Sequence, residues 1–515
     1  MVSEFHNEPL TDFTHPDNVA AQEAALQLVE ARLGRTYPLV IGGRRISGGP
    51  TFDSLNPSAP RQVVGRFAQA TVEQAGEAVG AAHQAFESWR WLPCAERAAV
   101  LFRMAALLRR HRFEMNAWMI LEVGKSWREA DGDTAEAVDF CEFYAREALR
   151  YGADQPVTPI PGEANQLVYI PIGVVAVIPP WNFPCAILTG MTGAALVTGN
   201  TVVLKPSSDS PAIAWRVFEL FEEAGVPPGA LNFLTGGGGT AGNAVVADPR
   251  TRAVAFTGSR DVGLHINELA AKTPKGQLWI KRVVAEMGGK GFILVDREAD
   301  LEAAAEGVTA AAFGFQGQKC SACSRAIVHQ DVYDEFLKLL LPRVRALPQG
   351  PVRNPAHHQG PVINAKAEQT ILGYIEQGRK EGRLLAGGAK ASGDGYFIQP
   401  TVIADVAPGA VIEQEEIFGP VLAVIRARDF DHGVEIANDT EYGLTGAVYS
   451  RNRATLARAR RLCHAGNLYL NRECTGALVG GHPFGGFNMS GTDSKAGGRD
   501  YLLLFLQAKA ISEAV

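Results

Sequence analysis

The sequence predicts an α/β fold in which helices cover a parallel sheet. From about residue 172 onward, short apolar runs, glycine or proline turns and helical segments follow one another four times. This alternation is typical of β-α-β units, whose strands are buried on both faces. At 515 residues the chain is too long for one ordinary core, so we expect two or three globular units.

Local signals support the individual elements. The apolar residues of 72–89 recur at spacings of three and four, which predicts an amphipathic helix. The predicted strands are short and rich in β-branched residues, as buried strands are. They are 173–178, 201–205, 231–234 and 252–256. Ser207 to Pro211 offer cap and first-turn residues for a helix that Gly225 can end.

A second unit is expected from Glu286 to about residue 483, with its own helices and strands. No Gly/Ser-rich linker separates the two units, so the cleft between them should be tight. The stretch Tyr501 to Leu506 is more apolar than a free tail tolerates. It therefore predicts burial against another element or subunit.

Charge and composition narrow the function. The net charge of -6 comes from interspersed acids and bases, so neither a nucleic acid nor a membrane surface is an expected partner. The first twenty residues hold acids but no Lys or Arg, which argues against a secretory signal or mitochondrial presequence and favours the cytoplasm. The most apolar stretch, Ile170 to Leu188, is interrupted by prolines and reads as a buried strand and a turn.

The seven cysteines are odd in number and scattered, which favours reduced thiols over a disulfide framework. Cys320 and Cys323 form a C-x-x-C, for which a redox pair or half a zinc site is the alternative interpretation. No second pair or His cluster supplies further ligands, so no metal is expected. Gly314 and Gly317 break an Ala-rich helical stretch and place the Cys320 thiol on a turn.

Cys320 is a candidate nucleophile, and Glu286 upstream is a candidate general base. Together they suggest an acyl enzyme that a carboxylate helps to hydrolyse. A buried, chemically inert thiol is the alternative for a lone cysteine. Asn182, between prolines at the end of the first strand, can donate an amide to an oxyanion, although a structural Asn in a turn is about as good an explanation.

Two segments have features of a dinucleotide site. Gly237 to Gly242 satisfies G-x-G-x-x-G after a strand, but a simple glycine turn explains it equally well. In Thr257-Gly258-Ser259 a strand ends at a glycine, and Ser259 can cap the next helix, whose N-terminus could hold a phosphate. Lys205, at the end of its strand, suits a ribose or phosphate, although a lone lysine is usually just solvated.

Six motifs in order resemble the aldehyde dehydrogenase superfamily, from about residue 40 to the C-terminus. They are Pro180 to Pro184, Lys205 to Ser207, Phe256 to Ser259, Glu286 to Lys290, Gly317 to Cys320 and Glu416 to Pro420. The resemblance implies a Rossmann-type cofactor domain, an α/β catalytic domain and a small β oligomerisation arm. These would be residues 1–158 with 175–285, then 286–483, and finally 159–174 with 484–515. A homo-oligomer, at least a dimer, is expected, with the segment 166–172 paired to the C-terminal end.

Two runs, 315–325 and 471–480, resemble the members of the superfamily that oxidise L-glutamate γ-semialdehyde, in equilibrium with 1-pyrroline-5-carboxylate, to L-glutamate in proline catabolism. By that resemblance the Cys320 thiolate attacks the aldehyde, the Asn182 amide and the Cys320 N–H hold the oxyanion, and Glu286 activates the hydrolytic water. The substrate-binding residues would be Phe183, Lys319, Ser321, Gly476, Ala477 and Phe484.

The resemblance also implies NAD as cofactor. The residues in matching positions are Ile178, Pro180, Trp181, Lys205, Ser207, Gly238, Phe256, Thr257, Gly258, Ser259, Glu416 and Phe418. Ser208 stands where many NAD-preferring relatives have a Glu that repels a 2′-phosphate, so NADP is left open as an alternative. Gly291 replaces an Asn or Asp often found after the Gly-Gly-Lys run.

Particular residues disfavour the nearest alternatives to this function. A dehydrogenase for another semialdehyde is disfavoured because a substrate with only a carboxylate would want an Arg or Lys in the pocket. A CoA-acylating relative is disfavoured because Glu286 is present as a base. The alternative outside the enzymes is a non-catalytic binding protein with this fold. A contact with a proline dehydrogenase is an open expectation, whereas a fused form is not expected, because about forty residues precede the match.

Overall fold

Within residues 3–515, the part that the computed structural model describes, two seven-stranded sheets form the centres of the two halves of the chain. The first sheet has the order β11-β10-β7-β8-β9-β2-β3, and its strands from β11 to β9 are parallel. Their bounds are Arg282–Glu286, Thr251–Thr257, Val174–Ile178, Thr201–Leu204, Leu231–Phe233, Leu39–Ile41 and Arg44–Ile46. The parallel sheet predicted from the alternating pattern is confirmed.

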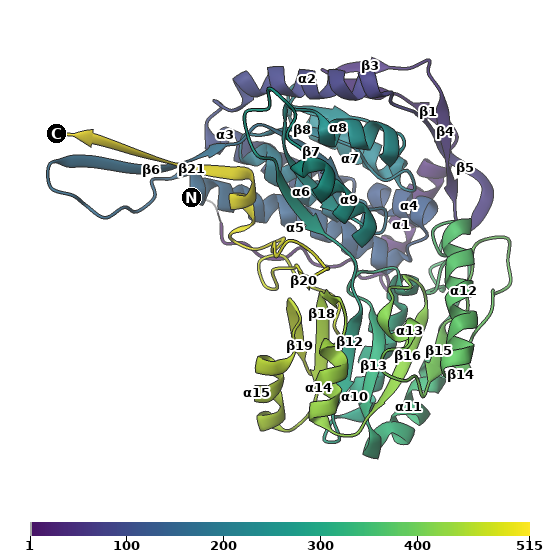
Figure 1. Ribbon diagram of the computed structural model, residues 1–515. Coiled ribbons are helices and arrows are strands. Elements are labelled where there is room, and N and C mark those ends of the chain that lie inside the picture. Colours follow the sequence, from purple (N-terminus) through teal and green to yellow (C-terminus); the bar gives the residue numbers. More distant parts are fainter. Residues whose placement is uncertain (1–2) are drawn as a thin grey trace.

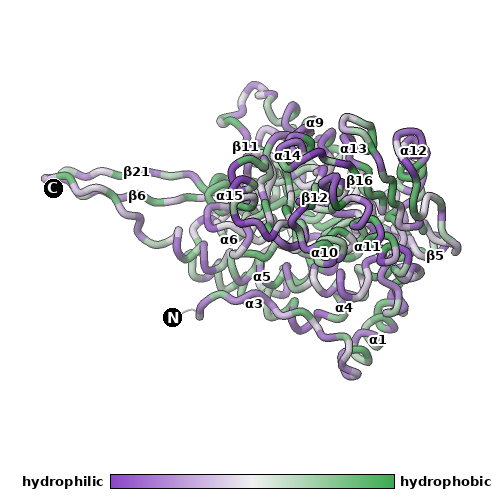
Figure 2. The backbone as a smooth tube through the Cα atoms, turned by 90° about the horizontal axis from the view of Figure 1, so that it is seen from below, coloured by the Kyte–Doolittle hydropathy of each residue, from purple (hydrophilic) through white to green (hydrophobic). Residues whose placement is uncertain are grey.

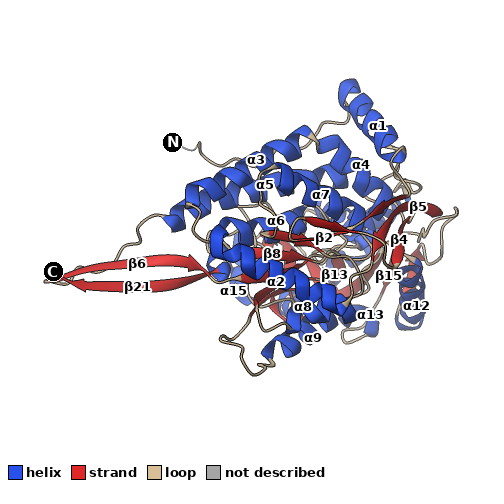
Figure 3. Ribbon diagram, turned by 90° about the horizontal axis from the view of Figure 1, so that it is seen from above, coloured by secondary structure: helices blue, strands red, loops and turns tan. Residues whose placement is uncertain are grey.

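Helices cover both faces of this first sheet (Figure 3). On one face lie α2, α8 and α9, which are Val72–Trp89, Asn243–Ala247 and Arg260–Ala271. On the other lie α1, α3, α4, α5, α6 and α7, which are Pro16–Glu30, Cys94–Arg110, Arg112–Val123, Trp127–Gly152, Ala186–Val197 and Pro211–Glu223. The amphipathic helix predicted at 72–89 is confirmed, and Thr71 caps it in a reciprocal capping box with Gln74.

The second sheet has the order β14-β15-β16-β13-β12-β18-β19. Its strands are Arg383–Ala386, Thr401–Ala404, Val421–Ala427, Cys323–His329, Gly291–Val295, Thr445–Tyr449 and Asn467–Leu470. Around it lie α10 to α15, which are Leu301–Phe313, Tyr333–Arg345, Ala365–Glu381, Val411–Gln414, Phe430–Asn438 and Arg453–Leu462. Separate apolar cores lie on its two faces. This half is the lower part of Figure 1.

Three smaller sheets complete the described chain. The first joins β1, β5 and β4 (Arg35–Tyr37, Ala59–Ala68 and Thr51–Asn56), and the second joins β17 and β20 (Tyr442–Gly443 and Phe487–Asn488). The third is an antiparallel hairpin of β6 (Glu163–Pro171) and β21 (Leu506–Ala514), which projects from the body with the C-terminus at its tip (Figure 1). The pairing predicted between the segment near 166–172 and the C-terminal end is confirmed. Apolar and polar residues are mixed along both of its strands (Figure 2).

The hairpin contains fewer residues than the expected arm, because residues 484–505 lie against the body. Phe484 pairs through its backbone with Ala496, at 2.8 Å in both directions. Tyr501 is buried, and its ring stacks on Tyr144 of α5 at 5.5 Å. The apolar stretch Tyr501–Phe505 forms a short 3-10 helix, η4, that packs into the core of the first half, so another element of the same chain covers it.

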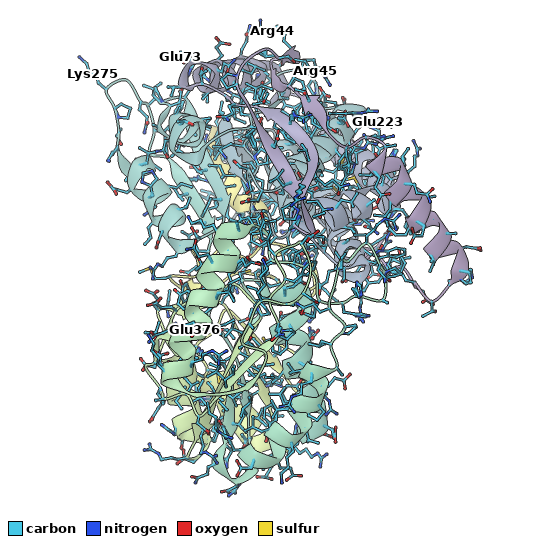
Figure 4. All side chains as sticks on the ribbon, turned by 90° about the vertical axis from the view of Figure 1, so that its right-hand side faces the viewer. Arg44, Arg45, Glu73, Glu223, Lys275 and Glu376 are labelled. Carbon is cyan, nitrogen blue, oxygen red and sulfur yellow. The ribbon has the colours of Figure 1, made fainter. Side chains whose placement is uncertain are left out.

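Charges of both signs share the outer surface. Arg44 and Arg45 of β3 lie on the same edge as Glu73 of α2 (Figure 4). Arg45 also pairs with Glu222 at 2.6 Å. Among the helices of residues 3–515, none has the length and apolar character needed to cross a membrane.

Candidate active site

The carboxyl ends of three neighbouring parallel strands bring several predicted residues to one edge of the first sheet. Phe256 of β10 is opposite Ile178 of β7, and Thr257 of β10 is opposite Glu286 of β11. Gly258 donates its N–H to the Glu286 carbonyl at 3.1 Å. Ligands of open α/β sheets bind at this end of the strands, so the edge is the natural position of a site.

The turn that carries Cys320 lies between the end of α10 and the start of β13. A short 3-10 segment, η2 (Gly314–Gly317), includes positive φ values of 49°, 57° and 67° at Phe315, Gln316 and Gly317. A Cβ at Gly317 would meet the Gly419 carbonyl oxygen at 2.3 Å, so both its conformation and its surroundings require glycine. The prediction that the Cys320 thiol lies on a turn is confirmed.

Asn182 lies against this turn. Its side-chain Nδ2 donates to the Gln318 carbonyl at 3.0 Å, and the residue is buried. A side-chain amide has two N–H donors, and this contact uses one of them. The second donor remains for a group near Cys320.

The Cys320 thiol is half-buried, with acids nearby. Burial raises its pKa to about 12, with Glu416 and Glu286 adding to the shift, while the N–H groups of Ser321 and Cys320 lower it. A thiol in this setting is protonated at neutral pH, and the thiolate is the nucleophile. Attack therefore requires the thiol to give up its proton first.

Glu286, at the end of β11, has the properties of a base for the water that hydrolyses an acyl enzyme. Burial raises its pKa to about 8, against the opposing effects of the Ser494 hydroxyl, the Lys495 charge and the Gly486 N–H. A catalytic base is most effective when its pKa lies near the working pH. The structure thus places a thiol and a carboxyl with perturbed pKa values near enough to influence each other, in one site.

Glycines after Glu286 allow Glu416 to approach. Gly289 donates its N–H to Glu416 Oε1 at 2.8 Å, and a Cβ at Gly288 would meet Glu416 Oε2 at 2.3 Å. Burial raises the pKa of Glu416 to about 7. A Cβ at Gly291 would meet the Ala322 carbonyl oxygen at 2.5 Å, so here an Asn or Asp has no room.

Lys205 and the glycine-rich turn lie together at the next part of the sheet edge. The Lys205 side chain is buried, its Nζ donates at 3.1 Å to the Pro206 carbonyl, and burial lowers its pKa to about 8. A Cβ at Gly242 would lie 3.4 Å from the Lys205 side chain. No atom within residues 3–515 would approach a Cβ at Gly238 or Gly239 within 4 Å, so open space borders this turn.

These residues fit a dinucleotide. A buried ammonium gains from an anionic or hydroxyl-rich ligand, which would restore the solvation it has lost. Ser259 caps the twelve-residue helix α9, accepting from the Val262 N–H at 3.4 Å, and leaves a positive helix end beside this edge. Gly237 to Gly242, however, folds into a π-helical turn, η1 (Gly238–Gly242), before α8.

The remaining predicted cofactor residues lie in the loops after β7, after β8 and before β16, and at the end of β10. The Trp181 ring meets the Phe418 ring edge-on at 5.5 Å, which joins the loop after β7 to the loop before β16. Thr257 Oγ1 contacts Met191 Sδ at 3.7 Å. Ser207 and Ser208 make local contacts, since Ser207 Oγ accepts the Asp209 N–H at 3.3 Å and Ser208 Oγ donates to the Gly236 carbonyl at 3.4 Å. Pro180 is buried at the end of β7.

The far side of the turn holds a dense set of charges. Lys319 pairs with Glu129 at 2.7 Å. Lys125 lies 3.9 Å above the Phe183 ring and pairs with Asp133 at 3.0 Å, both side chains being fully buried. Phe183 is thus in contact with a cation, a role that the sequence did not indicate.

Helix α5 supplies acids that the sequence analysis missed. Glu129, Asp133 and Glu136 recur at spacings of four and three, which puts them on one face of the helix. Burial raises the pKa of Glu136 to about 8, with Asp133 adding, while Lys125 and Lys319 lower it. Acids in the buried stripe of an amphipathic helix were the available signal, because acids are seldom buried without a functional or ionic partner.

The loop 471–480 lies against the residues after Cys320. Gly476 has a φ of 71°, and the Arg472 guanidinium donates to its carbonyl at 3.1 Å. Cys474 Sγ contacts the Ser321 carbonyl at 3.4 Å. The segment with Gly476 and Ala477 therefore belongs to a loop that contacts Ser321. Ala477 and Phe484 are both half-buried.

All seven cysteines are free thiols. Cys323 is buried beside Cys474, and burial raises the pKa of the Cys323 thiol, with Cys474 adding to the shift. Across residues 3–515, no cluster of three or more His, Cys, Asp or Glu side chains could hold a metal ion.

Comparison with known proteins gives one consistent family. The model of the aldehyde dehydrogenase family matches residues 46–511. The 1-pyrroline-5-carboxylate dehydrogenase of Geobacillus kaustophilus is 56% identical over 513 residues, covering 100% of both chains. A crystal structure of 1-pyrroline-5-carboxylate dehydrogenase from Thermus with bound NAD superposes with a TM-score of 0.98 at 50% identity, covering 100% of both chains. Proline utilization A from Bdellovibrio bacteriovorus matches with a TM-score of 0.98 at 45% identity over 99% of this chain and 53% of that one.

Proposed function

The chain belongs to the aldehyde dehydrogenase family, and from that membership we propose that it oxidises L-glutamate γ-semialdehyde, the open form of 1-pyrroline-5-carboxylate, to L-glutamate with NAD. The observation that carries the proposal is the turn of Cys320, which has the Asn182 amide against it and the Glu286 carboxyl nearby. A nucleophile, an amide donor and a base with a near-neutral pKa are the groups that thioester chemistry needs.

In the first half of the reaction, Cys320 releases its proton to solvent water, and its sulfur attacks the aldehyde carbon. The carbonyl π electrons move to oxygen, and the second N–H of Asn182 and the Cys320 N–H stabilise that oxyanion. When the oxyanion collapses, hydride leaves the same carbon and a thioester remains on Cys320. NAD supplies the hydride acceptor when it is bound.

In the second half, Glu286 takes a proton from water, and the water oxygen bonds to the thioester carbon. The C–S bond then breaks, its electron pair returns to Cys320, and glutamate is released. Because the pKa of Glu286 is about 8, the ionised form that this step needs becomes more abundant as the pH rises through that value.

The substrate's far end carries an ammonium and a carboxylate, and the pocket residues on that side carry both signs. Lys319, Glu129 and Glu136 lie there together. The N–H groups of Gly476 and Ala477 and the hydroxyl of Ser321 would receive the carboxylate, because glycine lets backbone donors approach a ligand closely. Phe183 and Phe484 would flank the aliphatic middle of the substrate.

NAD is the cofactor. Lys205 would take its adenine ribose, the capped end of α9 its phosphates, and Glu416 and Phe418 its nicotinamide ribose and ring. Ser208, in place of an acid, is compatible with NADP as a second oxidant, because no charge at that position repels a 2′-phosphate.

A homo-oligomer that forms through the projecting hairpin is part of the proposal. An isolated two-stranded hairpin is only marginally stable in water, so β6 and β21 would gain from packing on a second copy. A contact with a proline dehydrogenase is also part of the proposal. Its support is the structural match to proline utilization A, a longer chain of which 53% is covered. The seven free thiols favour the cytoplasm, which keeps thiols reduced.

The test is the rate of NADH formation by the purified chain with pyrroline-5-carboxylate, compared with succinate semialdehyde and propanal. A preference for pyrroline-5-carboxylate is expected. Turnover of the other aldehydes alone would contradict the substrate assignment, and no turnover of any would favour a non-catalytic role. A Cys320→Ala variant that keeps its activity would contradict the mechanism.

A further inference from the structure

The two oxygens of the Glu286 carboxyl have different surroundings. Oε1 accepts a hydrogen bond from the Ser494 hydroxyl. Oε2 is buried and has no hydrogen-bond partner among residues 3–515. Leaving a buried carboxylate oxygen without a partner costs free energy, which a reacting water in hydrogen-bonding position would recover.

The position of Ser494 is set by the segment before it, which runs antiparallel to the end of β11. Thr492 donates its N–H to the Ala285 carbonyl at 2.9 Å, and its hydroxyl accepts the Ala285 N–H at 3.0 Å. Met287 donates its N–H to the Ser490 carbonyl at 2.8 Å. Backbone contacts on both sides of the base therefore fix where the Ser494 side chain can reach.

Gly485, in a neighbouring loop, leaves room for the contact between Ser494 and Glu286. A Cβ at Gly485 would meet the Ser494 carbonyl oxygen at 1.7 Å and Glu286 Oε1 at 2.9 Å. Lys495, the next residue, donates from Nζ to the Gly466 carbonyl at 2.8 Å and also to the Gly485 carbonyl. The loop that carries Ser494 is thus tied to both halves of the molecule, which holds the Ser494 backbone within reach of the carboxyl.

We propose that Ser494 is a positioning residue for the hydrolytic step, whose hydroxyl holds Oε1 of Glu286 so that Oε2 takes the proton from the attacking water. This inference rests on the proposed function only in that it requires a thioester on Cys320 to be hydrolysed. The water oxygen forms the new bond to the thioester carbon, the water proton goes to Oε2, and the electron pair of the broken C–S bond returns to the sulfur.

Several groups around Glu286 interact with its charge. Lys495 and Asp493 lie on the same loop, Cys320 approaches from its turn, and Tyr144 and Tyr501 approach from α5 and η4. The Ser494 hydroxyl and the Lys495 ammonium favour the carboxylate, whereas burial and Asp493 favour the protonated acid. Loss of the hydroxyl should therefore raise the pKa of the base and shift the acidic limb of hydrolysis to higher pH.

The experiment uses p-nitrophenyl acetate, an activated ester that acylates a reactive thiol without any aldehyde or NAD. The burst of p-nitrophenol measures acylation of Cys320, and the steady-state rate measures deacylation. In Ser494→Ala the burst amplitude should be kept, and the steady-state rate should fall about tenfold. This loss is smaller than the whole contribution of a general base, because Glu286 is still present. The acidic limb should move upward by about 0.5–1 pH unit, the size expected for one lost hydrogen bond. Ser494→Thr, which restores a hydroxyl, should recover both.

Thr492→Val is the matched control, because it removes a hydroxyl of the same loop that does not touch the carboxyl, and it keeps the backbone bond from the Thr492 N–H to the Ala285 carbonyl that holds the loop. It should keep the wild-type acidic limb. A wild-type rate and limb in Ser494→Ala would overturn the proposal, as would equal loss of the burst in both variants, which would mark a structural role for the loop. If the ester results are as expected but pyrroline-5-carboxylate is not turned over, the substrate assignment fails while the role of Ser494 stands.

Discussion

Asn182 donates one N–H of its side-chain amide to the Gln318 carbonyl at 3.0 Å, which joins the loop after β7 to the turn of the reactive thiol. The contact links the two halves of the molecule at the point where the chemistry is proposed to occur. It also fixes the direction of the second N–H, so the same side chain has a structural contact and a proposed catalytic one.

Replacing Asn182 with Ala should therefore slow acylation more than it affects binding. Loss of one oxyanion donor costs about 10²–10³-fold in rate in comparable sites. The measurement is the rate of the first turnover of NADH formation under stopped flow, with the thermal midpoint of the variant as the check on folding. An unchanged first-turnover rate in a folded variant would show that the amide is purely structural.

Glu286→Gln should remove the pH dependence of hydrolysis. In the native chain the pKa of Glu286 is about 8, so the steady-state rate should rise as the pH approaches that value and then level off. In the Gln variant the first turnover should persist while the steady state becomes slow and loses this limb. The measurement is the pH profile of both phases, and a variant with the native profile would assign the base to another residue.

The same carboxyl should affect stability with a definite sign. Its pKa is raised in the folded state from the ordinary 4.5 to about 8, so its contribution to stability is fully present below about 4.5 and is lost as the pH rises through 8. Glu286→Gln, which stays neutral, should gain stability relative to the native chain as the pH rises from about 4.5 to about 8, and the difference should level off above that. Thermal unfolding across this range measures the difference, and a constant difference would contradict the raised pKa.

Ser208→Glu should sharpen the choice of cofactor. A carboxylate at this position would repel a 2′-phosphate and could accept from the adenine ribose, so use of NADP should fall at least about tenfold relative to NAD. The ratio of kcat/KM for the two cofactors measures the change. Ser208→Ala is the matched control and should leave the ratio near its native value, and an equal change in both variants would remove Ser208 from the cofactor site.

Gly291→Ala should destabilise the chain, since the added Cβ would lie 2.5 Å from the Ala322 carbonyl oxygen and 3.1 Å from Thr445 Oγ1. Overpacking of this kind costs about 1–3 kcal/mol. Urea unfolding measures the cost. Gly373→Ala is the control, because that Cβ would meet nothing within 4 Å and lies in helix α12, where alanine is favoured over glycine. Native stability in Gly291→Ala would show that the turn of Cys320 shifts easily.

The regular elements were predictable because their signals are local. The stripe at 72–89 and the β-branched strands from 173 to 256 each fit in one window of sequence, and the structure has them within one or two residues. The turn of Cys320 was predictable for the same reason, since Gly314 and Gly317 lie within six residues of it. The acids of α5 were missed because Glu129 and Glu136 lie almost 200 residues before Lys319, the residue with which they interact.

By itself, the sequence determined the α/β architecture, the identity of the candidate nucleophile and base, and the resemblance to a family, all of which depend on residue types and short spacings. Only the tertiary structure decided that Ser494 holds one oxygen of Glu286, that Glu136 lies near Lys319, and that residues 484–505 pack on the body and not on the hairpin. These three relationships depend on long-range packing. The burial of each group and its distance from charged neighbours set the pKa values of the site. A pKa is a property of the surroundings of a group, which no local pattern specifies.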